Sequence, residues 1–110
     1  MGSSYIPDRG DLVWLQFNPQ KGHEQAGHRP ALIISPKSYN RRVGLALLCP
    51  ITSKSKGYPF EVKVDIETIN GVILSDQVKS LDWQARKAKR AGSAPTQVTE
   101  EVRAKLLTLI

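Results

Sequence analysis

Cysteine and long hydrophobic runs are both scarce in this sequence of 110 residues, and each scarcity excludes a class of protein. The single cysteine, Cys49, lies in the apolar stretch "LALLCPI", so a disulfide scaffold is excluded. We expect its side chain to pack as a small apolar group rather than to act as a nucleophile. No run approaches the ~20 apolar residues of a membrane span, and the start "MGSSYIPDRGD" has no apolar signal region. We therefore expect a cytoplasmic protein with no membrane partner.

Acidic residues are the scarcer charge, with 10 Asp and Glu against 16 Lys and Arg and a net charge of +6. This excess suits a polyanionic partner such as nucleic acid or an acidic peptide, although solubility alone explains it equally well. The apolar content of 40% is enough for one core, so the sequence predicts a single domain over residues 1–110.

Short strands separated by polar turns dominate the first two thirds of the chain. In "DLVWLQF" (11–17), alternate residues are expected to face opposite sides of a strand. Further strands are expected at 29–35 and 43–51, with a helical turn between them at 36–42. A polar loop follows at 52–59, and the clean alternation of "FEVKVDI" (60–66) predicts a strand with one buried face.

The dipeptide Asn70-Gly71 is typical of a tight hairpin turn, so residues 72–74 are expected to fold back antiparallel, continuing through 77–80. Pro95 can open a helix in which Val98, Val102, Leu106 and Leu109 share one face. The expected fold is mainly β with a C-terminal α-helix, in a small and strongly bent sheet or barrel.

The stretch "KGHEQAGHRP" (21–30) concentrates candidate functional groups. His23 and His28 are five residues apart, about 140° around a helix, and so cannot share the helix face that the zinc-protease motif requires. No third ligand is evident, and we expect no metal site.

The same stretch suits a metal-free reaction on RNA, in which the 2′-hydroxyl of the substrate attacks the neighbouring phosphorus. Such an enzyme needs a proton acceptor, a donor for the leaving oxygen and fixed positive charge on the phosphate. Arg29 suits the last role, and Glu24 can accept a proton or orient Arg29. His28, next to Arg29 on a strand, is expected to face the other way. A loop whose charges only solvate it is the alternative.

Three blocks, "GDLVWLQFNPQKGHEQAGHRPALIIS" (10–35), "CPITSKSKGYPFEV" (49–62) and "GVILSDQVKSLDW" (71–83), resemble the MazF/PemK family of toxins from toxin–antitoxin pairs. The resemblance implies an SH3-like, strongly curved small β-barrel that works as a homodimer. It implies sequence-specific cleavage of single-stranded RNA without metal or other cofactor, leaving 2′,3′-cyclic phosphate and 5′-hydroxyl ends, and thereby inhibition of translation and growth. It also implies a cognate acidic antitoxin whose disordered tail covers the RNA groove.

By this resemblance, Arg29 and Thr52 match the catalytic pair of the family, and Glu24 matches its loop carboxylate. A threonine hydroxyl is no base without help, so the general base stays open between Glu24 and a water that it positions.

Several other residues are expected to bind RNA, although each has a plainer interpretation. The set comprises aromatic, amide, imidazole and cationic side chains beside the expected loops: Phe17, Asn18, His28, Lys56, Tyr58, Gln77 and Lys79, with Lys54 as a further candidate. For Phe17 the alternative to RNA binding is packing in the core, and for the lysines it is simple exposure on the surface. We expect Trp14 and Trp83 in the core or in a dimer contact.

Asp76 departs from the pattern of some relatives, which use an arginine two places earlier together with this aspartate; here that position is Leu74. We therefore expect Asp76 to be structural and Gln77 to be the better RNA contact.

Two other functions remain as alternatives to a ribonuclease: a non-catalytic toxin of similar fold that binds DNA topoisomerase, and a barrel that binds RNA without cleaving it. The presence of Arg29, Thr52 and Glu24 together in their expected blocks favours the ribonuclease.

Overall fold

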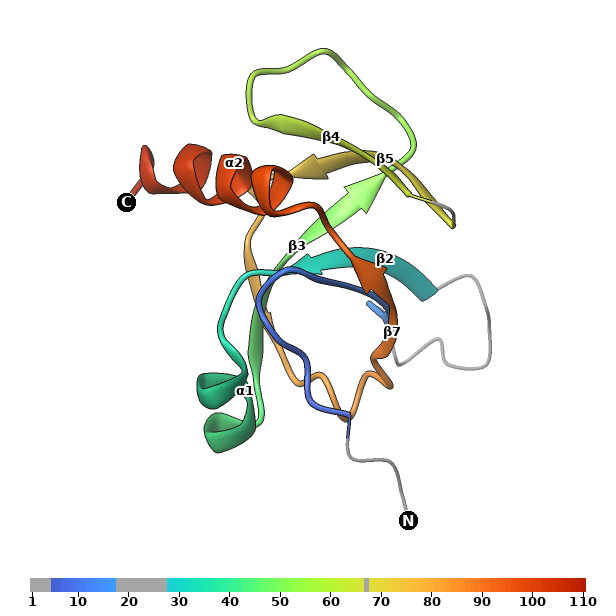
Figure 1. Ribbon diagram of the computed structural model, residues 1–110, viewed down its shortest axis with the longest axis vertical. Coiled ribbons are helices and arrows are strands. Elements are labelled where there is room, and N and C mark those ends of the chain that lie inside the picture. The colour runs from blue at the N-terminus through green and yellow to red at the C-terminus, as the bar shows by residue number, and fades with distance from the viewer. Residues whose placement is uncertain (1–4, 18–27, 67) are drawn as a thin grey trace.

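The computed structural model describes residues 5–17, 28–66 and 68–110. Within these ranges, seven strands and two helices follow one another (Figure 1). In chain order they are β1 (Asp11–Gln16), β2 (His28–Ile33), α1 (Lys37–Val43), β3 (Ala46–Thr52), β4 (Glu61–Ile66), β5 (Ile69–Leu74), β6 (Lys79–Leu81), β7 (Lys89–Ser93) and α2 (Thr96–Leu107).

The strands form one curled antiparallel sheet in the order β4-β5-β3-β2-β1-β7, with β6 paired to β3 off this path. Strand β3 is where the sheet bends. Its first part pairs with β2 and β6, whereas its last two residues pair with β5. The expected mainly β, strongly curved architecture with a C-terminal helix is confirmed.

The alternation predicted for the first strand is confirmed, because β1 contributes to a different hydrophobic cluster on each face. Leu12 and the partly buried Trp14 belong to the cluster that also contains Val102 of helix α2. Val13 and Leu15 belong to the second cluster, against which Phe17 and Trp83 pack. A strand covered on both sides explains why nearly every residue of this segment is apolar.

Helix α2 begins at Thr96, directly after Pro95, as expected. Val102 is fully buried and Val98 is partly buried, so the helix packs through its first three turns. Leu109 lies beyond the end of the helix and is half exposed, which corrects its predicted place on the buried face. In the described part of the chain, neither helix is long and apolar enough to cross a membrane.

The turn predicted at Asn70-Gly71 is wrong. Both residues lie inside β5, which pairs with β4 from Ile66↔Ile69 onward, so the chain reverses three residues earlier. The reason for the glycine is close packing. An ideal Cβ on Gly71 would lie 2.3 Å from the carbonyl oxygen of Thr52, so only glycine lets β5 pass this close to the end of β3.

Two further boundaries differ from expectation. The predicted continuation through 77–80 does not extend β5, because residues 79–81 form β6 and pair with β3 instead. Strand β7 was not predicted, because "KRAGS" has no apolar alternation. It is an edge strand held by its backbone pairing to β1, with only Ala91 packing on the core.

Candidate active site

The register of β2 and β3 brings Arg29 and Thr52 together. The β2–β3 ladder ends at the pair Ala31↔Pro50, and Arg29 and Thr52 each lie two residues beyond that pair, on β2 and β3. At this point β3 turns away to pair with β5. Pro50 lacks a backbone N–H, which favours the end of the β2–β3 ladder here. The two side chains therefore flank the opening where the strands separate.

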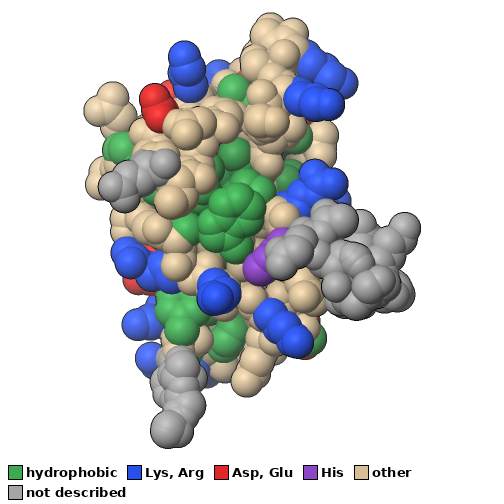
Figure 2. Space-filling model, turned by 90° about the vertical axis from the view of Figure 1, so that its right-hand side faces the viewer, with side chains coloured by type: hydrophobic (Ala, Val, Ile, Leu, Met, Phe, Trp, Pro, Cys, Tyr) green, Lys and Arg blue, Asp and Glu red, His purple; other side chains and the backbone are tan. Residues whose placement is uncertain are grey.

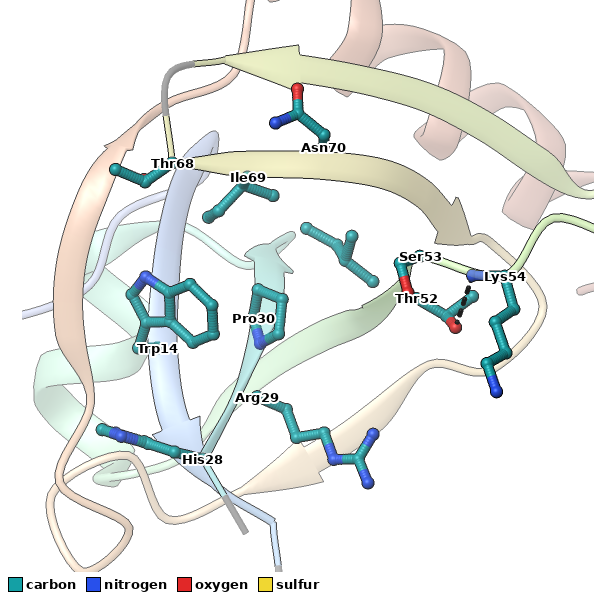
Figure 3. Close-up of a pocket in the computed structure, with 11 residues that line it drawn as sticks. Trp14, His28, Arg29, Pro30, Thr52, Ser53, Lys54, Thr68, Ile69 and Asn70 are labelled. Carbon is teal, nitrogen blue, oxygen red and sulfur yellow. Dashed lines mark hydrogen bonds between the residues drawn. The ribbon is translucent and has the colours of Figure 1, made fainter. Parts of the chain in front are cut away.

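Arg29 and Thr52 line two hollows on either side of this opening. The Trp14 hollow, of about 470 Å³, has an apolar floor that includes Trp14, Pro30 and Ile69. Figure 3 shows these three side chains around the hollow, with Arg29 and Lys54 extending along one side of it. The Arg86 hollow, of about 440 Å³, is lined by Arg29 and Thr52 together with Phe17, Gln77, Lys79 and Arg86.

A third hollow, of about 360 Å³, shares Thr52 with the other two, so Thr52 lies at the centre of the whole region. We call it the Tyr58 hollow. Its other lining residues include Lys54, Lys56, Tyr58, Glu61 and Gln77. The structure therefore brings the expected residues Arg29, Thr52, Phe17, His28, Lys54, Lys56, Tyr58, Gln77 and Lys79 to one connected surface.

Positive charge dominates this surface. Among the described residues, no Asp or Glu lines the Trp14 hollow or the Arg86 hollow, whereas Arg29, Lys54, Lys79 and Arg86 do. Figure 2 shows green hydrophobic side chains at the centre of one face, beside the purple His28 and with Lys and Arg around them. Such a surface attracts an anion and offers apolar area beside it.

The Thr52 hydroxyl is held in place from its own loop. Its Oγ1 accepts a hydrogen bond from the backbone N–H of Lys54 at 3.2 Å. A hydroxyl has one hydrogen and two lone pairs, so Oγ1 can still donate its proton to an oxygen of a bound anion. Next to Arg29, whose guanidinium can donate to two oxygens at once, this arrangement suits a phosphate.

His28 faces away from Arg29, as expected from neighbouring strand positions (Figure 3). Its ring lies 6.3 Å from the ring of Trp14 at a tilt of 59°, on the wall of the Trp14 hollow. Its Nε2 is buried without a hydrogen-bond partner in the described part of the chain. The expectation that Trp14 packs in the core is confirmed, but the residue also lines this hollow, a second role that its apolar periodicity gave no reason to expect.

Arg86 is the cation that sequence reasoning missed. Its Nη1 donates to the carbonyl oxygens of Gln16 at 3.2 Å and Phe17 at 2.7 Å, so it fixes the end of β1 while lining the Arg86 hollow. The only sequence signal was its membership of a basic run, which does not distinguish it from its neighbours. Phe17 itself is partly buried against the second core cluster and lines the same hollow, so both interpretations of this residue hold.

Glu61 organises the lysine-bearing loop between β3 and β4. Its carboxylate accepts hydrogen bonds from the backbone N–H groups of Lys56 at 2.9 Å and Gly57 at 3.2 Å, and from the Ser55 hydroxyl at 2.7 Å. These bonds lower the pKa of Glu61 below its ordinary value, and the bond from the Lys56 backbone has the largest effect. Gly57 adopts a left-handed φ of 70°, which glycine alone adopts without strain.

Cys49 is fully buried in the first core cluster, which confirms its expected packing role. Burial, with the nearby negative charge of Asp76, raises the pKa of its thiol to about 12. A thiol held in its protonated form is no nucleophile at neutral pH.

Glu24 and Asn18 lie outside the described residues, as does His23. Within residues 5–17, 28–66 and 68–110, no three His, Cys, Asp or Glu side chains are grouped so that they could hold a metal ion.

The comparisons with known proteins point one way. A family described as the PemK-like, MazF-like toxin of type II toxin-antitoxin system matches residues 8–110. The chain is 49% identical over 110 residues to the endoribonuclease toxin MazF of Escherichia coli K12, covering 100% of this chain and 99% of that protein. It is 37% identical over 109 residues to the endoribonuclease toxin ChpB of the same strain, covering 94% and 93%.

Solved structures agree with these matches. MazF of Deinococcus radiodurans superposes with a TM-score of 0.86 at 52% identity, covering 96% of this chain and 97% of that one. A MazE–MazF complex from the same organism matches with a TM-score of 0.85 at 47% identity, covering 96% of each chain.

Proposed function

Since the chain belongs to the PemK-like, MazF-like toxins of type II toxin–antitoxin systems, we propose that it is an endoribonuclease that cleaves single-stranded RNA. The observation that carries this proposal is that Arg29 and Thr52 line the same two hollows, which carry cations and, among the described residues, no carboxylate. The scissile phosphodiester binds at these two side chains, with the neighbouring nucleotides over the Trp14 hollow and the Arg86 hollow.

The reaction needs no nucleophile from the protein. The 2′-oxygen of the RNA forms a bond to phosphorus and the bond from phosphorus to the 5′-oxygen breaks, which leaves a 2′,3′-cyclic phosphate and a 5′-hydroxyl. Arg29 donates to the phosphate oxygens as negative charge accumulates on them, and the Thr52 hydroxyl donates to the same group. Glu24, or a water that it positions, takes the proton of the 2′-hydroxyl, and the departing 5′-oxygen takes up a proton from solvent.

The surrounding residues bind the rest of the strand. Lys54, Lys56 and Lys79 neutralise neighbouring phosphates, while Phe17, Asn18, His28, Tyr58 and Gln77 contact sugars and bases. Cleavage of mRNA at specific sequences then stops translation and growth in the cytoplasm, where the protein works as a homodimer. An acidic antitoxin tail covers the same groove, a role supported by the MazE–MazF complexes among the similar structures and by the net charge of +6.

The decisive experiment incubates the purified protein, in chelator, with a long unstructured RNA and maps the new ends by their chemistry and sequence. We expect discrete cuts that leave cyclic phosphate and 5′-hydroxyl ends. Arg29 is exposed, so R29A is expected to fold normally and to lose about 100- to 1000-fold in kcat. R29K, which keeps the charge but not the planar fork, is expected to recover only part of this loss. RNA that stays intact while binding in a salt-dependent way would reduce the protein to an RNA-binding barrel.

A further inference from the structure

Two walls of the proposed RNA groove are joined by one side-chain contact. The Tyr58 hydroxyl, on the loop between β3 and β4, donates a hydrogen bond to Oδ2 of Asp76, on the turn between β5 and β6. The loop also carries Lys54 and Lys56, and the turn also carries Gln77. These three side chains line the Tyr58 hollow, as Tyr58 itself does.

We infer that the Tyr58–Asp76 hydrogen bond holds these two walls together, and that Asp76 is a positioning residue and not the general base. The inference rests on the proposed ribonuclease function. It goes beyond that function because it assigns a positioning role to Asp76 and identifies Tyr58 as the hydrogen-bond partner of this carboxylate.

The two oxygens of the Asp76 carboxylate have different surroundings. Oδ2 accepts a hydrogen bond from the Tyr58 hydroxyl. Oδ1 is buried and has no hydrogen-bond partner among the described residues. A general base needs a lone pair within hydrogen-bond reach of the 2′-hydroxyl, and with Oδ1 buried and Oδ2 bound to Tyr58 the geometry favours a positioning role for Asp76.

Strand β5, which leads into the turn with Asp76, has no cationic side chain that could pair with this carboxylate. The residue two places earlier is Leu74, which lines the hollow with an apolar side chain. The preceding residue, Ser75, is buried, and its carbonyl oxygen accepts a hydrogen bond from the Cys49 thiol at 3.9 Å, so the turn that carries Asp76 is seated against the core.

Other contacts also hold the loop: the carbonyl oxygen of Phe60 accepts a hydrogen bond from the backbone N–H of Ser75 at 3.0 Å, and the Tyr58 contact adds a side-chain bond to this backbone link. Glu61 of β4 holds Ser55, Lys56 and Gly57, and Lys105 of α2 donates to the carbonyl oxygen of Pro59 at 2.7 Å. Within the described part of the chain, Tyr58–Asp76 is the one side-chain hydrogen bond between residues 53–60 and residues 75–78.

The Tyr58 ring is oriented for this contact. It packs edge-on against Phe60, with ring centroids 6.2 Å apart and an interplanar angle of 64°. The hydrogen bond to Asp76 is the first cause of a raised pKa of the Tyr58 hydroxyl, so the group stays protonated and keeps donating over the working pH range. Loss of the contact removes one of the bonds that hold this loop, so the segment with Lys54 and Lys56 opens more often and RNA is bound less tightly.

A protease test examines the contact without RNA. Trypsin cuts after Lys54 and Lys56 when the loop opens, and Y58F or D76A is expected to speed cutting at these two bonds by about three- to tenfold. Trypsin is expected to cut the double variant no faster than either single variant, because the same hydrogen bond is lost in all three proteins. Y39F is the matched control, since Tyr39 and Tyr58 are equally exposed at 37%. Unchanged cutting in Y58F and D76A would overturn the inference.

A kinetic test examines the role of Asp76. D76N keeps an oxygen that can accept from Tyr58, so its kcat is expected within about threefold of wild type, with an unshifted pH profile. Y58F is expected to raise KM for a short RNA by about three- to tenfold with little change in kcat. D65N, at an exposed position on β4, is the control for charge alone.

The outcomes separate the inference from the proposed function. A drop in kcat of about 100-fold in D76N with loss of the acidic limb of the pH profile, while Y58F behaves as wild type, would make Asp76 the base and overturn the inference. If wild-type protein cleaves no RNA, the proposed function fails, and the protease result still decides whether the contact holds the two walls.

Discussion

Replacing Gly71 by alanine tests how closely β5 must approach Thr52, the proposed catalytic threonine. An alanine Cβ at this position would lie 2.3 Å from the carbonyl oxygen of Thr52 and 3.0 Å from its carbonyl carbon. Both of these atoms belong to backbone, which cannot rotate out of the way. Because Cβ contacts below 3.0 Å essentially do not occur, the end of β3 must move from β5 by about 0.7 Å.

This displacement has two calculable consequences. Overpacking of this kind costs about 1–3 kcal/mol of unfolding free energy, equivalent to a fall in Tm of roughly 4–12 °C for a chain of this size. Misplacement of a catalytic group by about 1 Å costs about 100-fold in rate, so a shift somewhat smaller than this predicts a loss in kcat of about ten- to 100-fold.

The assay pairs cleavage of a short RNA under saturating conditions with thermal unfolding of the same samples. G92A is the matched control, because its Cβ would meet only Cδ1 of Ile66, at 3.0 Å, and the end of a flexible side chain can give way. We expect G92A to keep the wild-type kcat. A G71A protein with unchanged kcat and Tm would refute the argument that β5 limits the position of Thr52.

Three further predictions concern other groups of the site. The pKa of Glu61 is lowered from its ordinary 4.5, so its contribution to stability is present above that value and is lost as the pH falls through the lowered pKa. The difference in Tm between wild type and E61Q should therefore be largest near pH 7 and should shrink in acid. The Cys49 thiol, with a pKa of about 12, should react with a thiol reagent at pH 8 only when the protein unfolds. K56A and K79A should each reduce the slope of log Kd for single-stranded RNA against log salt by about 0.7.

Each of these predictions has a result that contradicts it. A Tm difference for E61Q that persists unchanged in acid would show that the Glu61 charge does not hold the loop. Complete labelling of Cys49 within minutes in the folded protein would contradict its burial. An unchanged salt slope in K56A, with K63A on the exposed side of β4 as control, would remove Lys56 from the phosphate contacts.

Local pattern was enough for the elements with a strong apolar period. The two faces of β1, the short helix over 37–43 and the start of α2 after Pro95 follow from residue spacing and proline geometry, because these signals are contained within a few residues. Strand β7 was not predicted because it is stabilised by pairing with β1, and its own residues give no local signal of that pairing.

Gly71 shows how a local signal can mislead. Asn-Gly is typical of a hairpin turn because both residues tolerate positive φ, but this glycine lies in an extended strand. Glycine is required here because of Thr52, which is 19 positions earlier in the chain on the neighbouring strand β3, and no short window of sequence contains that contact.

The sequence by itself determined the residue types available for phosphate chemistry, the excess of positive charge and the buried faces of the main strands. The blocks that resemble the toxin family singled out Arg29 and Thr52, which lie 23 positions apart in the chain. The tertiary structure decided that these two line the same hollows, because the β2–β3 pairing ends at Ala31↔Pro50 and β3 then pairs with β5. It also decided that Asp76 faces Tyr58 and the core, since hydrogen-bond partners depend on how loops from separate strands come to lie side by side.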